Sequence, residues 1–278
     1  MSSAYHWPVT TTPSSTGAWH GGEVGESIRC VLAGNPGPMT LDGTNTWLLS
    51  APGSNRGIVI DPGPDDEKHL MAVLGAAEER GVRVVSTLLT HGHLDHSAGA
   101  GRFAELTGSE VRALDPAHRY GGSGLADGEV IEVDGLRLAV VTTPGHTTDS
   151  LSFLLPELGA LLTGDTVLGR GTAVIAHPDG RLDEYLTSLA RLRDLCAASE
   201  VDLLLPGHGP VLEQPTDVLA GYLTHREARL AQVRQALAGG ARTAPEVVAV
   251  VYTDVDPSLH WAAEMSVRAQ LDYLERSP

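Results

Sequence analysis

The chain has 278 residues, little cysteine, few aromatic residues and almost no lysine. Its two cysteines, Cys30 and Cys196, cannot form a framework of several disulfides. They favour a reducing cytoplasmic location, with both thiols in the core. Lys68 is the only lysine among 19 basic residues, which together with abundant Gly and Ala indicates a GC-rich bacterial source. A formal net charge of −16 and an aromatic content of 4% argue against a surface built to attract and stack nucleic acid.

Long hydrophobic runs are also lacking. No stretch of about eighteen apolar residues occurs, so we expect no membrane-spanning helix. Residues 1–25 are rich in Ser, Thr and Gly and lack the basic start and apolar centre of a signal peptide, so we expect a flexible leader. The remainder is long enough to bury one substantial core and a small appendage. We therefore expect a large domain at 26–215 and a smaller domain at 216–278.

One short segment concentrates metal-binding side chains: His91-Gly92-His93-Leu94-Asp95-His96. It follows the apolar run 84–89, which predicts a buried strand. Imidazole nitrogen and carboxylate oxygen are ligands that zinc binds readily. A lone His-x-His pair would be weak evidence, whereas this cluster of three imidazoles and one carboxylate predicts a metal site.

Three later segments have the same construction, in which a His or an Asp follows an apolar run. Pro or Gly near each position stops the strand and opens a turn. These side chains are then expected on loops at one edge of a sheet, where the active sites of layered α/β proteins lie. The candidates are His146 after 136–141, Asp165 after 160–162 and His208 after 201–205.

Five histidines and two aspartates suit two metal ions, for which we expect two Zn²⁺, with other divalent metals as alternatives. Unrelated polar loop residues are the competing explanation, and the repeated strand, turn and ligand pattern argues against it. The expected division is His91, His93 and His146 on one ion, Asp95, His96 and His208 on the other, and Asp165 bridging both.

The motif at 91–96 followed by His146, Asp165 and His208 resembles the metallo-β-lactamase superfamily, in the order that this family uses. The resemblance implies an α/β fold, an αββα sandwich with a two-metal site at the sheet edge. Flavodiiron proteins of this fold carry Glu where this chain has His93, and dizinc β-lactamases carry Cys at the position of Asp165. Both branches therefore fit less well than a general dizinc hydrolase.

A narrower resemblance rests on residues 35–48, NPGPMTLDGTNTWL, and residues 225–229, HREAR. Both are similar to the β-lactamase-like protein 2 branch, whose animal member is a single-strand-specific endoribonuclease and whose fungal relatives are thioesterases. The branch implies a small winged-helix-like tail, for which we expect helices at 217–237, 243–252 and 258–276. The chain ends where a winged helix would place its β-hairpin, so a helical lid is the alternative.

The ligand set predicts hydrolysis. A hydroxide bridging two zinc ions is a nucleophile at neutral pH, because coordination lowers the pKa of bound water to about 7. We expect Asp95 and Asp165 to be catalytic as well as metal-binding, and Asp149 to orient a ligand histidine. His177 and His225 are candidates for lining the pocket, and a solvated loop position is the alternative for His177.

Three functions stay open at this point. A small acyl ester or thioester substrate is favoured by the net charge of −16. RNA is favoured by the narrower resemblance and disfavoured by that charge. A non-catalytic metal-binding scaffold is disfavoured by the complete ligand set.

Overall fold

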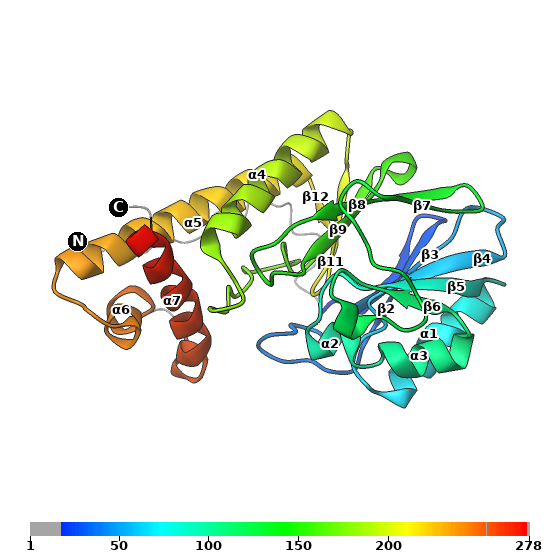
Figure 1. Ribbon diagram of the computed structural model, residues 1–278, viewed down its shortest axis with the longest axis horizontal. Helices are drawn as coiled ribbons and strands as arrows, with labels where there is room; N and C mark the ends of the chain where they lie inside the picture. Colours follow the sequence, from blue (N-terminus) through cyan, green and yellow to red (C-terminus); the bar gives the residue numbers. More distant parts are fainter. Residues whose placement is uncertain (1–17, 254, 277–278) are drawn as a thin grey trace.

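The computed structural model describes residues 18–253 and 255–276. Its body contains two six-stranded sheets packed face to face, and the C-terminal helices lie at one end of this body (Figure 1). The largest core cluster takes residues from both sheets, among them Trp47 and Ile60 from the first and Leu138 and Phe153 from the second. The αββα sandwich predicted from the sequence is therefore confirmed.

The first sheet has the order β1-β2-β3-β4-β5-β6. Strands β1 to β4 pair antiparallel, whereas β4, β5 and β6 run parallel. Parallel neighbours end at the same edge, which brings the loops after β4 and β5 together. The bounds are β1 Gly22–Val24, β2 Ile28–Leu32, β3 Asn45–Leu49, β4 Arg56–Ile60, β5 Arg83–Leu88 and β6 Glu110–Arg112.

The second sheet has the order β12-β11-β10-β9-β8-β7. Its strands pair antiparallel except for β10 and β11, which are parallel. The bounds are β7 Val130–Val133, β8 Leu136–Thr142, β9 Leu151–Leu155, β10 Ala160–Gly164, β11 Leu203–Pro206 and β12 Leu212–Glu213.

Helices cover the outer face of each sheet. Helix α1, Glu67–Glu79, and helix α3, Ala100–Thr107, pack on the first sheet. Helix α4, Leu182–Ala198, packs on the second sheet and beside α5, Pro215–Ala238 (Figure 1). The short helices are α2 Leu94–Ser97, η1 Pro116–His118 and η2 Pro156–Leu158.

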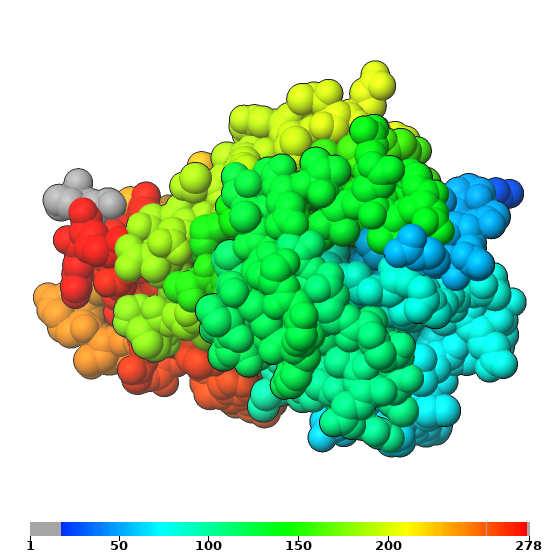
Figure 2. Space-filling view, turned by 45° about the vertical axis from the view of Figure 1, so that its right-hand side comes forward, coloured from blue at the N-terminus to red at the C-terminus, as the bar shows by residue number. Residues whose placement is uncertain are grey.

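The C-terminal helices share a small core of their own. Helix α6, Ala244–Val251, and helix α7, His260–Arg276, follow α5, with η3 at Pro257–Leu259 between them. The described residues of 239–276 are helices and turns without a strand. Figure 2 shows these helices in orange and red at one side of the body.

Strand β1 lies inside the segment that the sequence predicted to be a flexible leader, residues 1–25. It pairs antiparallel with β2, and Trp19 Nε1 donates a 2.8 Å hydrogen bond to Asn45 Oδ1. Ordered structure therefore begins before residue 26. The sequence did not predict this strand because Gly22–Val24 has no apolar alternation and is held by backbone pairing at a sheet edge. Residues 1–17 of the predicted leader lie outside the described residues.

Both cysteines are free thiols in the core, as predicted. Cys30 and Cys196 are buried, and the Cys30 thiol donates a 3.2 Å hydrogen bond to Asn45 Oδ1. Over residues 18–253 and 255–276, none of the helices combines the length and the hydrophobicity that crossing a bilayer would require.

Candidate metal centre

All seven predicted ligand side chains meet at one edge of the two sheets. They lie on the segments that follow β5, β8, β10 and β11; Asp95 and His96 belong to the short helix α2, and His93 is the residue that caps its N-terminus. Their ligand atoms form overlapping groups within which all atoms lie within 4.8 Å of one another. Three of these groups are His91, His93 and His146; Asp95, His96 and His208; and His91, His96 and Asp165.

The first group brings three imidazole nitrogens together. His93 Nδ1 lies 3.0 Å from His91 Nε2 and 3.1 Å from His146 Nε2. His91 and His146 are buried, whereas His93 is half-buried. The three nitrogens can therefore share one cation that is reached from the side of His93.

The second group combines two imidazoles with a carboxylate. His208 Nε2 lies 3.2 Å from His96 Nε2 and 3.1 Å from Asp95 Oδ2. Both imidazoles are fully buried, while the Asp95 side chain is 28% exposed. Asp95 therefore forms the open side of this group.

Asp165 lies between the two groups. Its Oδ2 atom is 3.7 Å from His146 Nε2 in the first group and 3.4 Å from His208 Nε2 in the second. The close approach depends on Gly207, where an added Cβ would stand 2.5 Å from Asp165 Oδ1. Asp165 is therefore placed to be shared by the two groups.

Two of the histidines have their outer nitrogens fixed by backbone carbonyls. His146 Nδ1 donates to the Val174 carbonyl at 2.7 Å, and His208 Nδ1 donates to the Gly43 carbonyl at 3.1 Å. A carbonyl only accepts, so Nδ1 carries the hydrogen. In the neutral ring the lone pair then sits on Nε2 and faces the centre.

Asp61 sets the same tautomer in His91 and His96. Its carboxylate accepts hydrogen bonds from the Thr90 hydroxyl at 2.6 Å and from His96 Nδ1 at 2.9 Å. The hydroxyl hydrogen of Thr90 is thereby used, so Thr90 Oγ1 accepts from His91 Nδ1 at 3.0 Å. Four imidazoles therefore direct Nε2 lone pairs inward.

The expectation that Asp149 orients a ligand histidine was wrong. Asp149 accepts a hydrogen bond from the Thr147 hydroxyl at 2.7 Å, and Asp61 has the orienting role instead. A signal for Asp61 was present in the sequence. It follows the apolar strand β4 just as His91 follows β5, and the two strands are parallel neighbours.

The donor set fits divalent cations. Inward lone pairs only 3.0 to 3.2 Å apart repel one another unless a positive charge lies between them. The spacing is close to the roughly 3.4 Å that separates two ligands of a tetrahedral zinc ion. Asp165 Oδ1 is also buried without a hydrogen-bond partner, as expected of a carboxylate oxygen that binds a metal.

The electrostatics differ between the groups. Burial lowers the pKa of His91 well below its usual value and that of His146 to about 4, which keeps both rings neutral and able to bind a metal. Burial opposes a charge on His96 and His208 as well. The nearby carboxylates, Asp165 foremost, nevertheless raise the pKa of His96 well above its usual value and that of His208 to about 9. The second group thus attracts positive charge, which either protons or metal ions can supply.

Comparison with known proteins agrees with this geometry. Residues 39–208, more than half of the chain, match the family described as the Metallo-beta-lactamase superfamily. The chain belongs to this superfamily. Residues 243–277 match the Beta-lactamase associated winged helix domain, so this metallo-beta-lactamase superfamily member carries that domain at its C-terminal end. The predicted winged-helix-like tail is thereby confirmed.

Two relatives match most of this chain. The chain is 34% identical over 239 residues to "Atrochrysone carboxyl ACP thioesterase" of Aspergillus fumigatus, covering 80% of this chain and 72% of the relative. It is 33% identical over 271 residues to "Beta-lactamase-like protein 2 homolog" of Drosophila melanogaster, covering 90% and 88%. A solved metallo-beta-lactamase family protein from Thermus thermophilus superposes with a TM-score of 0.74 at 24% identity, covering 90% of this chain and 93% of that one, and shows the shared fold.

The two candidate pocket histidines are not among the converging ligands of the described residues. His177 is half-buried on the loop between β10 and α4, and His225 is half-buried on α5. Neither belongs to a group of possible metal ligands among the described residues, so their roles in the pocket stay predictions.

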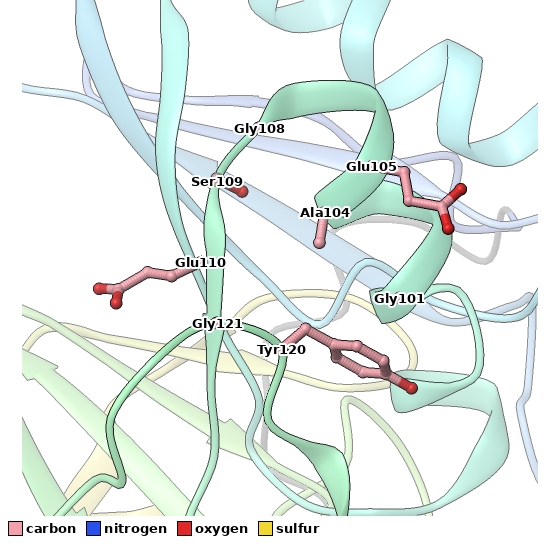
Figure 3. Close-up of a pocket in the computed structure, with 8 residues that line it drawn as sticks. All are labelled: Gly101, Ala104, Glu105, Gly108, Ser109, Glu110, Tyr120 and Gly121. Carbon is pink, nitrogen blue, oxygen red and sulfur yellow. The ribbon is translucent and has the colours of Figure 1, made fainter.

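A separate open groove of about 520 Å³ lies beside α3 and β6 (Figure 3). Small residues line most of it, together with Glu105, Glu110 and Tyr120. None of the seven predicted ligands lines it, so it contributes nothing to the metal centre.

Proposed function

We propose that the protein is a dinuclear zinc hydrolase that cleaves a small acyl ester or thioester. The observation that carries the proposal is the pair of adjacent ligand groups with Asp165 between them and with imidazole lone pairs directed inward. His91, His93 and His146 would hold one ion, Asp95, His96 and His208 the other, and Asp165 both. Two such ions, when bound, supply a hydroxide nucleophile near neutral pH and stabilise negative charge on the reacting oxygen.

The surrounding side chains would prepare this chemistry. Asp61, Thr90 and the carbonyl groups hold the imidazoles in the metal-binding tautomer, so little reorganisation is needed when substrate arrives. Burial opposes ionisation of Asp95, but His208 and His96 lower its pKa to about 2. Asp95 therefore stays ionised at neutral pH, and its partial exposure lets it accept a hydrogen bond from the attacking water.

The choice of an acyl substrate rests on charge and on one relative. A net charge of −16 opposes the counterion-driven binding of long polyanions. The relative from Aspergillus fumigatus bears a thioesterase name. An uncharged or short acyl chain needs no basic surface, so it agrees with both observations.

Purified, metal-quantified protein assayed against small thioesters, esters, lactones, phosphodiesters and single-stranded RNA tests the proposal. We expect hydrolysis of thioesters or esters, and we expect His93→Ala, which removes a ligand of the first ion, to abolish it. Cleavage of RNA alone would replace the acyl substrate with a phosphodiester. If the fully metal-loaded protein hydrolysed none of these substrates, the result would support a non-catalytic metal-binding scaffold instead.

A further inference from the structure

Helix α5 carries an arginine that is buried against the catalytic domain. Arg226 is 7% exposed, and its guanidinium lies 4.9 Å from the centre of the Tyr185 ring. Its Nη2 atom donates to the Ala173 carbonyl at 2.5 Å, while Nε has no hydrogen-bond partner. Burying a guanidinium is costly, so an arginine at this position indicates a specific requirement for its donor.

Arg226 is one of three side chains by which the C-terminal helices hold the segment 168–175. Tyr222 Oη, also from α5, accepts from the Leu168 amide at 2.9 Å and donates to the Gly171 carbonyl at 2.9 Å. From α7, Ser266 Oγ accepts from the Ile175 amide at 3.4 Å. Figure 1 shows this segment in yellow-green between the second sheet and these helices.

The other side of the same segment orients a ligand. The Val174 carbonyl, next along the chain from Ala173, accepts the Nδ1 hydrogen of His146 at 2.7 Å. That carbonyl belongs to the same planar peptide unit as the Ile175 amide, so one rigid unit joins Ser266 of α7 to His146. Movement of the helices would therefore move the acceptor that fixes the His146 tautomer.

We propose that helix α5 and the winged-helix domain that follows it position the metal centre, with Arg226 and Tyr222 of α5 holding segment 168–175 so that His146 keeps its Nε2 lone pair directed at the cation. The inference rests on the proposed function, because it takes His146 as a metal ligand. Arg226 and Tyr222 act through this segment and are positioning residues. Arg226 and Tyr222 therefore control metal affinity as well as turnover.

Arg229 on the same helix is a matched control. Its guanidinium lies 4.7 Å from the centre of the Tyr252 ring, and it donates to the Val251 carbonyl at 3.0 Å. It thus repeats the stacking and the carbonyl contact of Arg226, but both of these contacts stay within the C-terminal domain. Replacing either arginine by Met removes a stacked guanidinium, and only Arg226→Met releases the segment next to His146.

The experiment measures zinc affinity of the full-length chain by competition with a chelator. We expect Arg226→Met to lower the affinity for one of two ions about tenfold to a hundredfold, the range found when a group that orients a metal ligand is removed. Arg226→Lys, which can still donate to the Ala173 carbonyl, should recover most of this loss. Arg229→Met should keep the wild-type affinity within about twofold.

A milder variant keeps the test decisive if Arg226→Met fails to fold. Tyr222→Phe removes only the hydroxyl that holds Leu168 and Gly171, and we expect it to weaken the same ion about threefold to tenfold. Wild-type affinity in Tyr222→Phe and in any folded Arg226→Met, or equal losses in the two arginine variants, would overturn the positioning role. A wild-type protein that binds no metal would instead contradict the proposed function.

Discussion

The Oδ2 atom of Asp61 lies 2.9 Å from Nδ1 of His96, and both side chains are fully or almost fully buried. The same oxygen accepts the Thr90 hydroxyl hydrogen, and the other carboxylate oxygen accepts the Thr90 amide at 2.7 Å. Asp61 therefore determines the tautomer of His96 directly and that of His91 through Thr90.

Replacing Asp61 with Asn should therefore impair metal binding without removing a ligand. An amide nitrogen at the Oδ2 position would donate to His96 Nδ1 and move the ring hydrogen to Nε2, where it faces the cation. We expect zinc affinity at one ion to fall about tenfold to a hundredfold, measured by chelator competition. Asp149→Asn is the matched control, because Asp149 bonds to Thr147, and it should keep wild-type affinity. A loss of zinc affinity in Asp149→Asn but not in Asp61→Asn would instead support the orienting role expected of Asp149.

A second prediction concerns Gly207. An added Cβ would stand 2.5 Å from Asp165 Oδ1 and 2.7 Å from His96 Cε1, closer than side chains tolerate. Gly207→Ala should displace Asp165 from its place between the two groups, lowering bound metal below two ions and kcat by at least about tenfold. Metal analysis and steady-state kinetics would show this.

Gly75 supplies the control for that substitution. It lies within α1 and has no heavy atom near the added Cβ within 4 Å, so Gly75→Ala should leave metal content unchanged and stabilise the helix by up to about 1 kcal/mol. Full metal content and activity in Gly207→Ala would contradict the bridging position of Asp165.

Much of the centre could be predicted because its chemistry is local in sequence. His91 and His208 each follow a strand and a turn, and residue type alone marks them as ligands. The regular elements were equally visible, and the helix predicted at 217–237 is α5, Pro215–Ala238. Helix α2 and strand β12 were not predicted, because four and two residues are too few to show a period.

The supporting contacts could not be predicted in the same way. Asp61 meets His96 across 35 positions, and Tyr222 meets Leu168 across 54. Such pairs are created by strand order and helix packing, which leave no spacing pattern along the chain. An orienting carboxylate was expected, and only the parallel pairing of β4 with β5 shows which one it is.

Removing the metals should destabilise the fold. Ions bound only by the native state raise stability by mass action, so stripping them with a chelator should lower the melting temperature. Asp165→Ala should reduce occupancy of both ions, because Asp165 faces both groups. Calorimetry with elemental analysis tests both statements. An unchanged melting temperature in verified metal-free protein would show that metal binding does not stabilise the fold. A single tightly held iron ion in active protein would exclude the dizinc assignment.

His69 should make stability depend on pH. It is 4% exposed, lies 2.8 Å from Thr46 Oγ1, and burial lowers its pKa to about 4. Below a pH of about 6.5, His69 binds a proton in the unfolded chain but stays neutral in the folded chain, so stability is lost as the pH falls towards 4. At pH 5 the loss should reach about 2 kcal/mol. His69→Gln removes this contribution and should show a shallower fall between pH 7 and pH 5.

Denaturant unfolding of metal-free wild type and His69→Gln at both pH values is the appropriate comparison, because excess chelator excludes proton competition for the ions. Parallel pH dependence in the two proteins would show that His69 is not held neutral in the fold.

Salt dependence distinguishes the two substrate classes. A small acyl ester or thioester releases no array of condensed counterions, so its kcat/KM should change less than about twofold between roughly 50 and 200 mM salt. An RNA substrate bound through several phosphates would lose affinity by orders of magnitude over the same range. We expect the weak dependence, because the chain carries a formal net charge of −16.

The same salt series with His93→Ala distinguishes hydrolysis at the metal centre from background hydrolysis. This variant lacks His93 Nδ1, the atom that lies close to the ligand nitrogens of both His91 and His146. Acyl hydrolysis that is insensitive to salt and lost in His93→Ala would support the proposed substrate class. Micromolar binding to single-stranded RNA with a steep salt slope, and RNA cleavage that disappears in His93→Ala, would assign the same metal centre to phosphodiester hydrolysis. Because the nucleophile and the ligands are common to both reactions, such a result would change the substrate and leave the metal assignment intact.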